Sequence, residues 1–454
     1  MTTLPLVSHD SPHSIVAWRA AGAVTLRDFL TEVNELAARF PAGKHLLNLC
    51  NDRYCFSVGL AAAIVSGRVS LLPSTHTPGV IAQVKDFAPD VFCLTDSDNC
   101  TVELPQLRYP AQRAFGAASI QPTTPLAVPQ IDSTQQVAVV FTSGSTGVPQ
   151  PHAKTWGALV RCVQAEAARL KIPRDAPCTV IGTVPPQHNY GFESTVLMPW
   201  HNGNAFSHAH PFYPADICHA LAAVPSPRVL VSSPVHLRAL MGMQLTLPQI
   251  ASVVSATAPL SIQLARDVET QCAAPLYEIY GSTETGQIAS RRPTQSAQWQ
   301  LFPGVTWIAA GDRMRAVGGH IETTAPMNDV IESVSDDLFL LHGRIADLIN
   351  IAGKRQSLTG LDHLLNAIPG VVDGAFYMPD ENGADQVTRL AACVVAPGLD
   401  ARQVLAALRV HLDPVFLPRP LLFVDALPRN STGKLPRTAL QALLQTRAAK
   451  ASDE

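Results

Sequence analysis

Two patterns of apolar residues alternate along the first two thirds of the chain. Short continuous apolar runs are typical of buried strands, and the stretches between them carry apolar residues at helical spacing. The predicted strands are Leu46–Leu49, Val91–Leu94, Val137–Phe141, Thr179–Thr183, Val229–Ser232 and Ile250–Ser255. The predicted helices are Leu26–Phe40, Thr155–Leu170, Ala215–Ala223 and Ser261–Cys272. This alternation predicts an α/β fold with a large N-terminal domain of α/β layers.

The pattern changes twice toward the C-terminus. From about Trp299 to Leu341 it predicts short strands with Gly and Pro turns, which indicates a small β-rich subdomain. After Gly343-Arg344 a second unit is predicted. Its elements are the helices Leu361–Ile368 and Ala401–Leu412 and the strands Gly374–Tyr377 and Leu390–Val395. We therefore expect an N-terminal domain over residues 1–344 and a small α+β C-terminal domain over residues 345–454.

The composition excludes several classes of protein. The chain has 454 residues, enough for two or three domains, and 47% apolar against 15% charged residues is a globular composition. The net charge is −3 without a run of Lys or Arg, so we expect no nucleic-acid partner. The apolar stretch Val58–Val65 is too short to span a bilayer and predicts a buried helix, so no transmembrane segment is expected. Nine scattered cysteines without a C-x-x-C pair indicate reduced thiols in a cytoplasmic protein.

A run of small polar residues and glycines directly follows the predicted strand Val137–Phe141. The run consists of Thr142, Ser143, Gly144, Ser145, Thr146 and Gly147, and a helix is expected soon after it. Glycines let the backbone approach an anion and hydroxyl groups add donors, and strand, tight loop and helix together form a familiar phosphate cradle. It is not a Walker loop, because no Lys-Ser or Lys-Thr follows the last glycine. Taken alone, the run fits a phosphate-binding loop and a plain surface turn equally well.

The sequence FTSGSTG-x-P resembles the phosphate-loop signature of the superfamily of acyl-CoA synthetases, peptide-synthetase adenylation domains and luciferases. Three further segments resemble motifs of that superfamily in the same order: Tyr280–Gly286, Gly343-Arg344 and Leu427–Arg437. The resemblance covers nearly the whole chain. It implies an adenylate-forming enzyme that uses ATP to convert a carboxylic acid into an acyl-AMP and then transfers the acyl group to a thiol. It also implies that the C-terminal domain is mobile and rotates between the two steps.

The resemblance implies a nucleotide site that begins with the phosphate loop. Tyr280 is expected against the adenine, Asp329 on the ribose hydroxyls, and Arg344 also on the nucleotide. The same site is expected to include Thr257, Ala258, Pro259, Gly281 and Ser282.

The resemblance implies catalytic roles for four residues. Thr283 is expected to contact the nucleotide and Glu284 to hold Mg²⁺ on the phosphates, since a carboxylate beside a triphosphate is costly without a cation between them. His188 is expected to border the carboxylate of the substrate. Lys434, in P-x-x-x-T-G-K-x-x-R, would bridge the acyl carboxylate and the α-phosphate and offset the charge that builds there.

Two further sets of residues are expected to line the acyl pocket and to approach the acceptor thiol, which we call the thiol side. The pocket set is Tyr190, Gly191, Phe192, Ser232, Ser233, Ala256 and Ile288, and the thiol side is Gly353, Lys354 and Arg355. The two aromatic residues suit a small aryl acid such as 4-hydroxybenzoate better than a long fatty acid, although they fit core packing equally well. The acceptor is expected to be the phosphopantetheine thiol of an acyl carrier protein or of CoA.

The sequence departs from the superfamily pattern at several positions. Gln150 stands where the phosphate loop usually ends in Lys, and Lys154 is a candidate replacement. Asn328 stands where a Gly usually precedes the ribose-binding Asp, and Ala346 occupies the hinge position. The residues of segments 147–156 and 347–355 resemble the same segments of the short ligases of aryl polyene and xanthomonadin-type pigment clusters. Those ligases load an aryl acid onto an acyl carrier protein.

Two alternatives stay open. The first is a ligase that adenylates an amino acid or a fatty acid, and the absence of an Asp at the start of the acyl pocket argues against an amino acid. The second is a non-catalytic protein that binds a nucleotide or an acyl ligand, as Gln150, Asn328 and Ala346 allow. The retained Glu284, Arg344 and Lys434 favour an enzyme.

Overall fold

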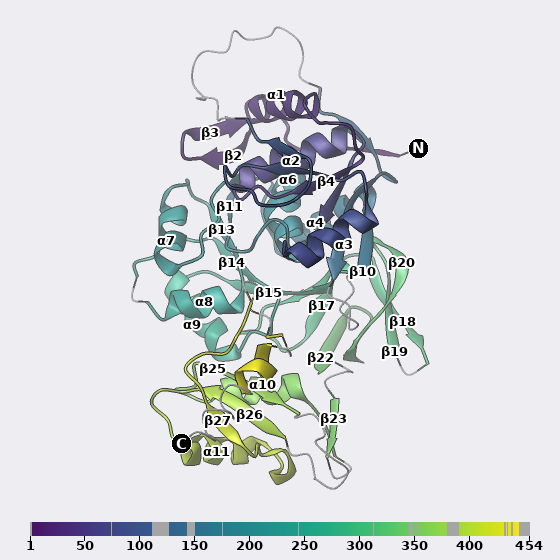
Figure 1. The fold of residues 1–454 in the computed structure, drawn as a ribbon. Coiled ribbons are helices and arrows are strands. Elements are labelled where there is room, and N and C mark those ends of the chain that lie inside the picture. The colour runs from purple at the N-terminus through teal and green to yellow at the C-terminus, as the bar shows by residue number, and fades with distance from the viewer. Residues whose placement is uncertain are drawn as a thin grey trace.

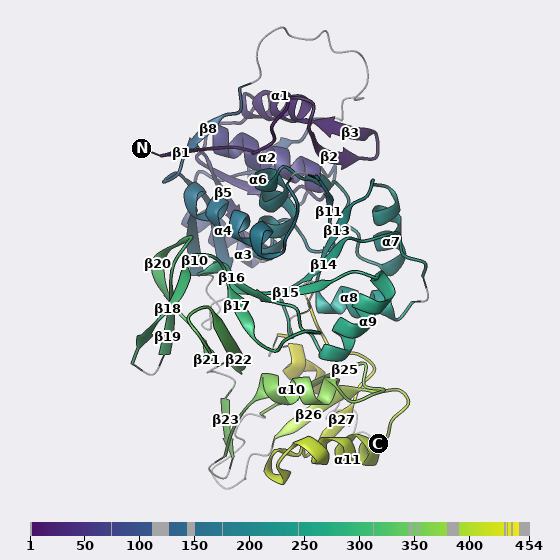
Figure 2. The same cartoon turned by 180° about the vertical axis from the view of Figure 1, so that it is seen from behind.

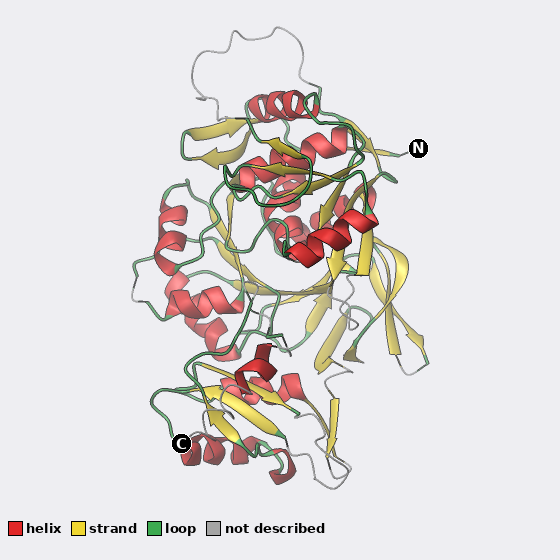
Figure 3. Ribbon diagram, in the orientation of Figure 1, coloured by secondary structure: helices red, strands yellow, loops and turns green. Residues whose placement is uncertain are grey.

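The computed structural model describes residues 2–73, 75–110, 127–142, 150–174, 176–243, 245–311, 313–344, 348–351, 354–378, 390–430, 433, 435–436 and 439–444. It consists of a large α/β part, a small β-sheet at its side, and a smaller C-terminal unit below (Figure 1). Helices and strands alternate through the large part (Figure 3), which confirms the α/β fold class. In the described part of the chain, no helix is long and apolar enough to cross a membrane.

The first sheet has six strands in the order β10-β9-β5-β4-β6-β7, all parallel except β10. Its strands are β4 (His45–Asn48), β5 (Val69–Leu72), β6 (Phe92–Thr95), β7 (Gln106–Arg108), β9 (Gln136–Thr142) and β10 (Gln150–Thr155). Helices α2 (Arg53–Val65) and α3 (Pro78–Phe87) form the crossovers between β4, β5 and β6. A two-stranded ladder of β1 (Thr3–Pro5) and β8 (Gln130–Asp132) lies apart from this sheet.

The second sheet has eleven strands, and its centre is parallel. The central strands are β12 (Ala205–Ser207), β11 (Thr179–Gly182), β13 (Arg228–Ser232), β14 (Ser252–Ser255) and β15 (Leu276–Ser282). Helices α7 (Pro214–Ala222), α8 (Pro234–Met241) and α9 (Ile262–Cys272) connect them. One edge is β2 (Ile15–Arg19) with β3 (Gly22–Thr25); the other is β16 (Gly286–Arg291), β17 (Trp299–Leu301), β22 (Leu338–Arg344) and β21 (Asp329–Ser333).

The predicted β-rich subdomain is divided between two sheets. Strands β17, β21 and β22 extend the large sheet, whereas β18 (Val305–Ala310), β19 (Arg313–Gly318) and β20 (Ile321–Pro326) form an antiparallel sheet of their own. Seen from behind, this small sheet lies beside β10 (Figure 2). A hydrogen bond of 2.7 Å from Thr155 Oγ1 to Glu322 Oε1 joins β10 to β20.

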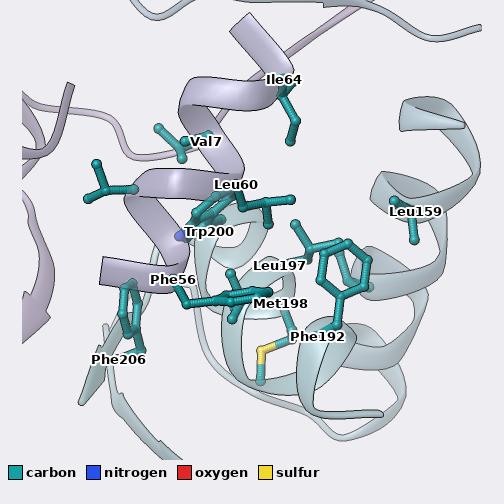
Figure 4. Close-up of a cluster of buried hydrophobic side chains, with 14 of the residues drawn as sticks. Val7, Phe56, Leu60, Ile64, Leu159, Phe192, Leu197, Met198, Trp200 and Phe206 are labelled. Atoms are coloured by element: carbon teal, nitrogen blue, oxygen red, sulfur yellow. The ribbon is translucent and has the colours of Figure 1, made fainter. Parts of the chain in front are cut away.

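The main core lies where α2 meets the helices that follow β11. Phe56 and Leu60 of α2 lie beside Phe192 and Trp200 (Figure 4). The helices on this side are α1 (Leu26–Ala37), α4 (Trp156–Arg169), α5 (Asn189–Phe192), the π-helical turn η1 (Glu193–Leu197) and α6 (Met198–Asn202). Helix α2 is buried from its first residue to Ile64, which confirms the predicted buried helix.

Helix α1 illustrates how local sequence sets these boundaries. Its N-cap Thr25 and Asp28 form a capping box, in which each side chain bonds to the backbone N–H of the other. The side chains that it buries follow one face of the helix at spacings of three and four residues: Leu26, Phe29, Leu30, Val33 and Leu36.

The C-terminal unit has apolar clusters of its own. Its elements are β23 (Leu348–Ile351), β24 (Lys354–Ser357), α10 (Leu358–Asn366), β25 (Asp373–Tyr377), β26 (Ala391–Val395), α11 (Ala401–His411), the 3₁₀ turn η3 (Pro414–Phe416) and β27 (Leu421–Phe423). The expected helix-strand-strand-helix order is present as α10, β25, β26 and α11. The domain boundary stays a prediction, since residues 345–347 lie outside the described part of the chain.

The structure adds a strand in front of the predicted helix Thr155–Leu170. Gln150–Thr155 forms β10, antiparallel to β9. Side chains alternate along this strand, so that Lys154 is buried while its neighbour Ala153 is exposed. Pro151 is tolerated because β10 is the edge strand of its sheet. Helix α4 then begins at Trp156.

Arg53, the first residue of α2, is completely buried and connects α2 to the end of β11 and to η1. Its Nη2 donates to the carbonyl oxygens of Gly182 at 2.8 Å and Val184 at 3.1 Å, and its Nη1 donates to Thr195 Oγ1. Burial lowers the pKa of Arg53 to about 9, so the guanidinium is still charged at neutral pH. The residue therefore fixes the end of β11 relative to η1.

We predict that Arg53→Met lowers the free energy of unfolding by about 2–4 kcal/mol, because two buried carbonyl groups and a hydroxyl lose their donors. Chemical denaturation followed by circular dichroism measures the change. Arg39→Met, at an exposed arginine, is the control and should leave the midpoint unchanged. Equal midpoints for both variants would contradict the assigned role.

Candidate active site

The carboxyl ends of four parallel strands meet at one edge of the large sheet. The ladder pairs Gly182 of β11 with Val231 of β13, and Ser232 of β13 with Ser255 of β14, which in turn pairs with Glu278 of β15. The segments that follow these strands therefore leave from the same edge. Ligands of open α/β sheets bind beyond the carboxyl ends of the strands, so this edge is the candidate active site.

A strained residue marks the end of β14. Thr257 has a φ of +81°, a left-handed conformation that β-branched residues rarely adopt. Such strain persists only where surrounding structure enforces it, and it gathers at functional sites. Thr257 and Ala258 are partly exposed and Pro259 is exposed, whereas Ala256 is buried. The predicted adenine-packing stretch is therefore accessible at the edge of the sheet.

Tyr280 connects two of the residues predicted for the nucleotide. Its hydroxyl donates to Asp329 Oδ2 at 2.6 Å, and Asp329 lies directly opposite Arg344 in the antiparallel pair of β21 and β22. The ring of Tyr280 is tilted against Trp299 and Phe339, with centroids 5.6 and 5.8 Å away. The phenol is therefore held by packing on one side and by a carboxylate at its tip.

The turn between β15 and β16 presents Glu284, whose side chain is 38% exposed. Ser282 N donates to Thr285 Oγ1 at 3.1 Å, which closes the turn around Thr283. Gly281 is required here, since a Cβ on it would lie 2.2 Å from the carbonyl oxygen of Gly286. Glu284 is thus presented by a turn with little freedom to change shape.

Two basic residues of β10 face this turn. Lys154 Nζ donates to the carbonyl oxygen of Thr283 at 2.5 Å, and His152 Nε2 lies 3.9 Å from Glu284 Oε1. Burial opposes ionisation of Glu284, but the hydrogen bond from Ser282 and the charge of Lys154 outweigh it, so the pKa lies below the usual value. In the sequence Lys154 is only a candidate replacement for the missing lysine, and its place beside this turn follows from the pairing of β10 with β9 and its contact with Thr283.

His188 and the aromatic residues after it occupy less open positions. His188 is the N-cap of α5, and its Nδ1 accepts a hydrogen bond of 3.3 Å from Tyr190 N. Tyr190 and Phe192 belong to the main core, and Phe192 lies among Leu197 and Met198 (Figure 4). Gly191 has no room for a side chain, because a Cβ would lie 2.0 Å from the carbonyl oxygen of Pro185.

The remaining residues predicted for the acyl pocket are also buried. Ser232 and Ser233 belong to a hydrogen-bond network with Thr183 and His236, with distances of 2.9 Å from Thr183 Oγ1 to Ser232 Oγ and from Ser233 Oγ to His236 Nδ1. Ile288 packs in the apolar cluster beneath β16 and β17. The role of these residues toward an acyl group stays a prediction.

A family model described as AMP-binding enzyme matches residues 44–327, which contain all of the edge described above. The chain belongs to the AMP-binding enzyme family.

Two similar proteins bear the name 4-coumarate–CoA ligase. That of Halorhodospira halophila is 32% identical over 308 residues, which cover 65% of this chain and 73% of that protein. That of Rhodobacter capsulatus is 29% identical over 299 residues, with 65% and 74% covered. The fold matches ATP-bound MatB from Rhodopseudomonas palustris with a TM-score of 0.80 at 18% identity, over 96% of this chain and 97% of that one. It also matches o-succinylbenzoate CoA synthetase from Bacillus subtilis in complex with its acyl-adenylate, with a TM-score of 0.80 at 15% identity over 98% and 99% of the chains.

Several residues that are predicted for this AMP-binding enzyme lie outside the described part of the chain. They are Ser143, Gly144, Ser145, Thr146, Gly147, Gly353 and Lys434, and the side chains of Thr142, Arg344, Lys354 and Arg355 are likewise not described. The backbone of the last two lies in β24. Gly433, which precedes Lys434, is described, and a Cβ on it would lie 3.4 Å from Val235 Cβ in α8. Gly433 thus lies against the first turn of α8, the helix directly after β13.

A buried acidic pair, Glu166 of α4 and Glu193 of η1, lies behind the Glu284 turn. A Cβ on Gly286 would lie 3.3 Å from Glu193 Oε1 and 3.2 Å from Cys162 Sγ, which places the pair directly beneath β16. Burial and the neighbouring carboxylate of Glu193 raise the pKa of Glu166 to about 8. Glu166 is therefore mainly protonated at neutral pH.

This pKa makes stability depend on pH. Because Glu166 has a pKa of about 8 in the folded chain against 4.5 as its ordinary value, its stabilising effect is complete below pH 4.5 and is lost as the pH rises through 8. We predict that Glu166→Gln, which cannot ionise, gains in Tm relative to the wild type as the pH rises from about 5 to about 9. Thermal unfolding across this range measures the difference, with the exposed Glu103→Gln as control. A difference in Tm that is independent of pH would contradict the assignment.

Proposed function

We propose that this AMP-binding enzyme activates a carboxylic acid with ATP, forms an acyl-AMP and pyrophosphate, and transfers the acyl group to the thiol of CoA. The observation that carries the proposal is the arrangement at the end of β15. There Glu284 faces the basic residues of β10, while Tyr280 of the same strand holds Asp329. The short segment from Tyr280 to Glu284 would thus bind the nucleoside at one end and the phosphates at the other.

The contacts of Tyr280 support the proposed nucleoside binding. Its ring is already fixed by Trp299 and Phe339, so stacking an adenine on it costs little side-chain entropy. The Asp329 carboxylate has two oxygens, each of which can accept more than one hydrogen bond, so it can bind ribose hydroxyls while it keeps the bond to Tyr280. Thr257 and Ala258, partly exposed at the end of β14, complete this face.

The residues around Glu284 fit a Mg²⁺-bound triphosphate. An accessible carboxylate with a lowered pKa is ionised at neutral pH, and Mg²⁺ is typically held by one or two carboxylates together with substrate phosphates. When bound there, Mg²⁺ would neutralise charge on the phosphate oxygens. Lys154 supplies a second positive charge from β10, in place of the lysine that Gln150 replaces.

The proposed reaction has two chemical steps. An oxygen of the acid's carboxylate attacks the α-phosphorus of ATP, a new P–O bond forms, and pyrophosphate leaves. The Lys434 ammonium group is proposed to offset the negative charge that builds on the oxygens in this step. In the second step the thiol sulfur attacks the acyl carbon, the C–O bond to phosphate breaks, AMP leaves, and the thiol proton is lost to solvent.

A small aryl acid is the proposed substrate. The names of the two 4-coumarate–CoA ligases support it, as does a similar protein named 3-hydroxybenzoate–CoA ligase from an Aromatoleum strain, 28% identical over 167 residues that cover 35% of this chain and 29% of that protein. The same names favour CoA as the acceptor. Transfer to an acyl carrier protein, which the short segments 147–156 and 347–355 suggest, is the alternative that the acceptor experiment decides.

We predict ATP–pyrophosphate exchange that depends on an added aryl acid and is lost in Lys434→Ala. The exchange rate should fall by about a hundredfold or more, because the charge at the α-phosphate is no longer offset. The matched control is Lys85→Ala, at an exposed lysine of α3, which should exchange like the wild type. ATP binding without exchange for any acid would instead support a non-catalytic binding protein.

We predict that 4-coumarate and 4-hydroxybenzoate give faster exchange than fatty acids of twelve or more carbons, by about tenfold or more. With the better acid, thioester formation is then measured with CoA and with a phosphopantetheinylated acyl carrier protein in competition. Faster exchange with a fatty acid or an amino acid would overturn the aryl assignment. Preferential loading of the carrier protein would overturn CoA as the acceptor.

A further inference from the structure

The guanidinium group of Arg429, in the C-terminal unit, joins Asp373 of β25 to Gly433. Its Nε and Nη2 donate to the two carboxylate oxygens of Asp373, the first residue of β25, at 2.7 and 2.9 Å. Its Nη1 donates to the carbonyl oxygen of Gly433 at 3.1 Å. Such a bidentate pair fixes the orientation of both groups, which a single ammonium cannot do.

The pair is partly buried, which strengthens it. The side chains of Arg429 and Asp373 are 21% and 13% exposed. Burial opposes the charge on Arg429, but its hydrogen bonds to Asp373 outweigh this, and the pKa of the guanidinium lies above its ordinary value. Ion pairs that are shielded in this way contribute more than pairs on the open surface.

Asp373 also reaches the large part of the molecule. Arg238 of α8 lies with its Nη1 4.0 Å from Asp373 Oδ1, and Gly433 lies against Val235 of the same helix. Arg238, Asp373, Arg429 and Gly433 line a common cavity of about 70 Å³. The carboxylate of Asp373 is thus shared between an arginine of each unit, at the place where the chain toward Lys434 meets α8.

Gly433 needs such support from outside. It has a φ of +81° and no side chain of its own, so nothing within the residue restricts its backbone. Two bonds restrict it from outside: its N–H donates to the carbonyl oxygen of Asn430 at 2.9 Å, and its carbonyl oxygen accepts from Arg429.

We propose that Arg429 and Asp373 are positioning residues for formation of the acyl-AMP. The pair holds Gly433, the residue before Lys434, against α8, and Arg238 couples this arrangement to the large part of the molecule. The inference rests on the proposed function, in which Lys434 acts at the α-phosphate. Attack of a thiol on the acyl carbon builds no charge on a pentavalent phosphorus, so that step does not need the pair.

The test separates the two steps. In Arg429→Ala and Asp373→Asn, the kcat of acid-dependent ATP–pyrophosphate exchange should fall about tenfold or more, with the KM for ATP nearly unchanged. Thioester formation from synthetic 4-hydroxybenzoyl-AMP and CoA should stay within about twofold of the wild type. Arg429→Lys should recover only part of the exchange, because lysine cannot bind a carboxylate bidentately. Arg409→Ala, at an exposed arginine of α11, is the matched control for both steps.

Equal loss in both steps would overturn the proposal, since that is the result of a merely structural role, and so would unchanged exchange. Hydrogen exchange of the peptide 427–436 measures the arrangement without any substrate. Its amides should exchange faster in Arg429→Ala and Asp373→Asn, and unchanged protection would also overturn the proposal. If the wild type shows no pyrophosphate exchange with any acid, the proposed function fails, and the hydrogen exchange still decides whether Arg429 holds this segment.

Discussion

Parallel pairing of β11, β13, β14 and β15 is the constraint on which the rest of the site depends. The backbone groups of these strands bond to one another, so the polar groups that remain for a ligand are those beyond the last pair. Each strand must also release its following segment at the same edge. Thr257 and Tyr280, each two residues beyond the last pair of Ser255 with Glu278, therefore lie at the same edge although helix α9 separates them in the sequence. The strain at Thr257 is the visible cost of turning the chain at this edge.

Two hairpins then determine the charge of the site. The turn of β15 and β16 carries Glu284, and the partner hairpin of β9 and β10 brings Lys154 to it from another sheet. The bond from Lys154 to the Thr283 carbonyl oxygen spans residues far apart in the chain and joins the two hairpins. A positive charge thus lies beside the Glu284 turn, although Gln150 at the start of β10 is not basic.

The contact between the large part and the C-terminal unit is different in kind. Among the described residues, the cavity there is lined by charged groups such as Arg238, Asp373 and Arg429, together with small apolar side chains such as Val235 and Pro259. Polar contacts between units exchange readily with water, so such an interface can open without exposing a core. The apolar clusters of the C-terminal unit are its own, which keeps its fold independent of that contact. Directional contacts such as those of Arg429 can therefore orient a segment without locking the units together.

The sequence by itself determined the fold class, the position of most central strands and helices, and the family, because periodicity and contiguous motifs are local properties of the chain. Helix α9 and strand β13, for example, lie within a residue or so of their predicted limits. Only the tertiary structure decided which face each residue presents. It placed Phe192 in the core, turned 150–155 into an edge strand, set Lys154 beside Thr283, and brought Asp373 between two arginines. These outcomes depend on packing between segments distant in sequence, and no local pattern carries that information.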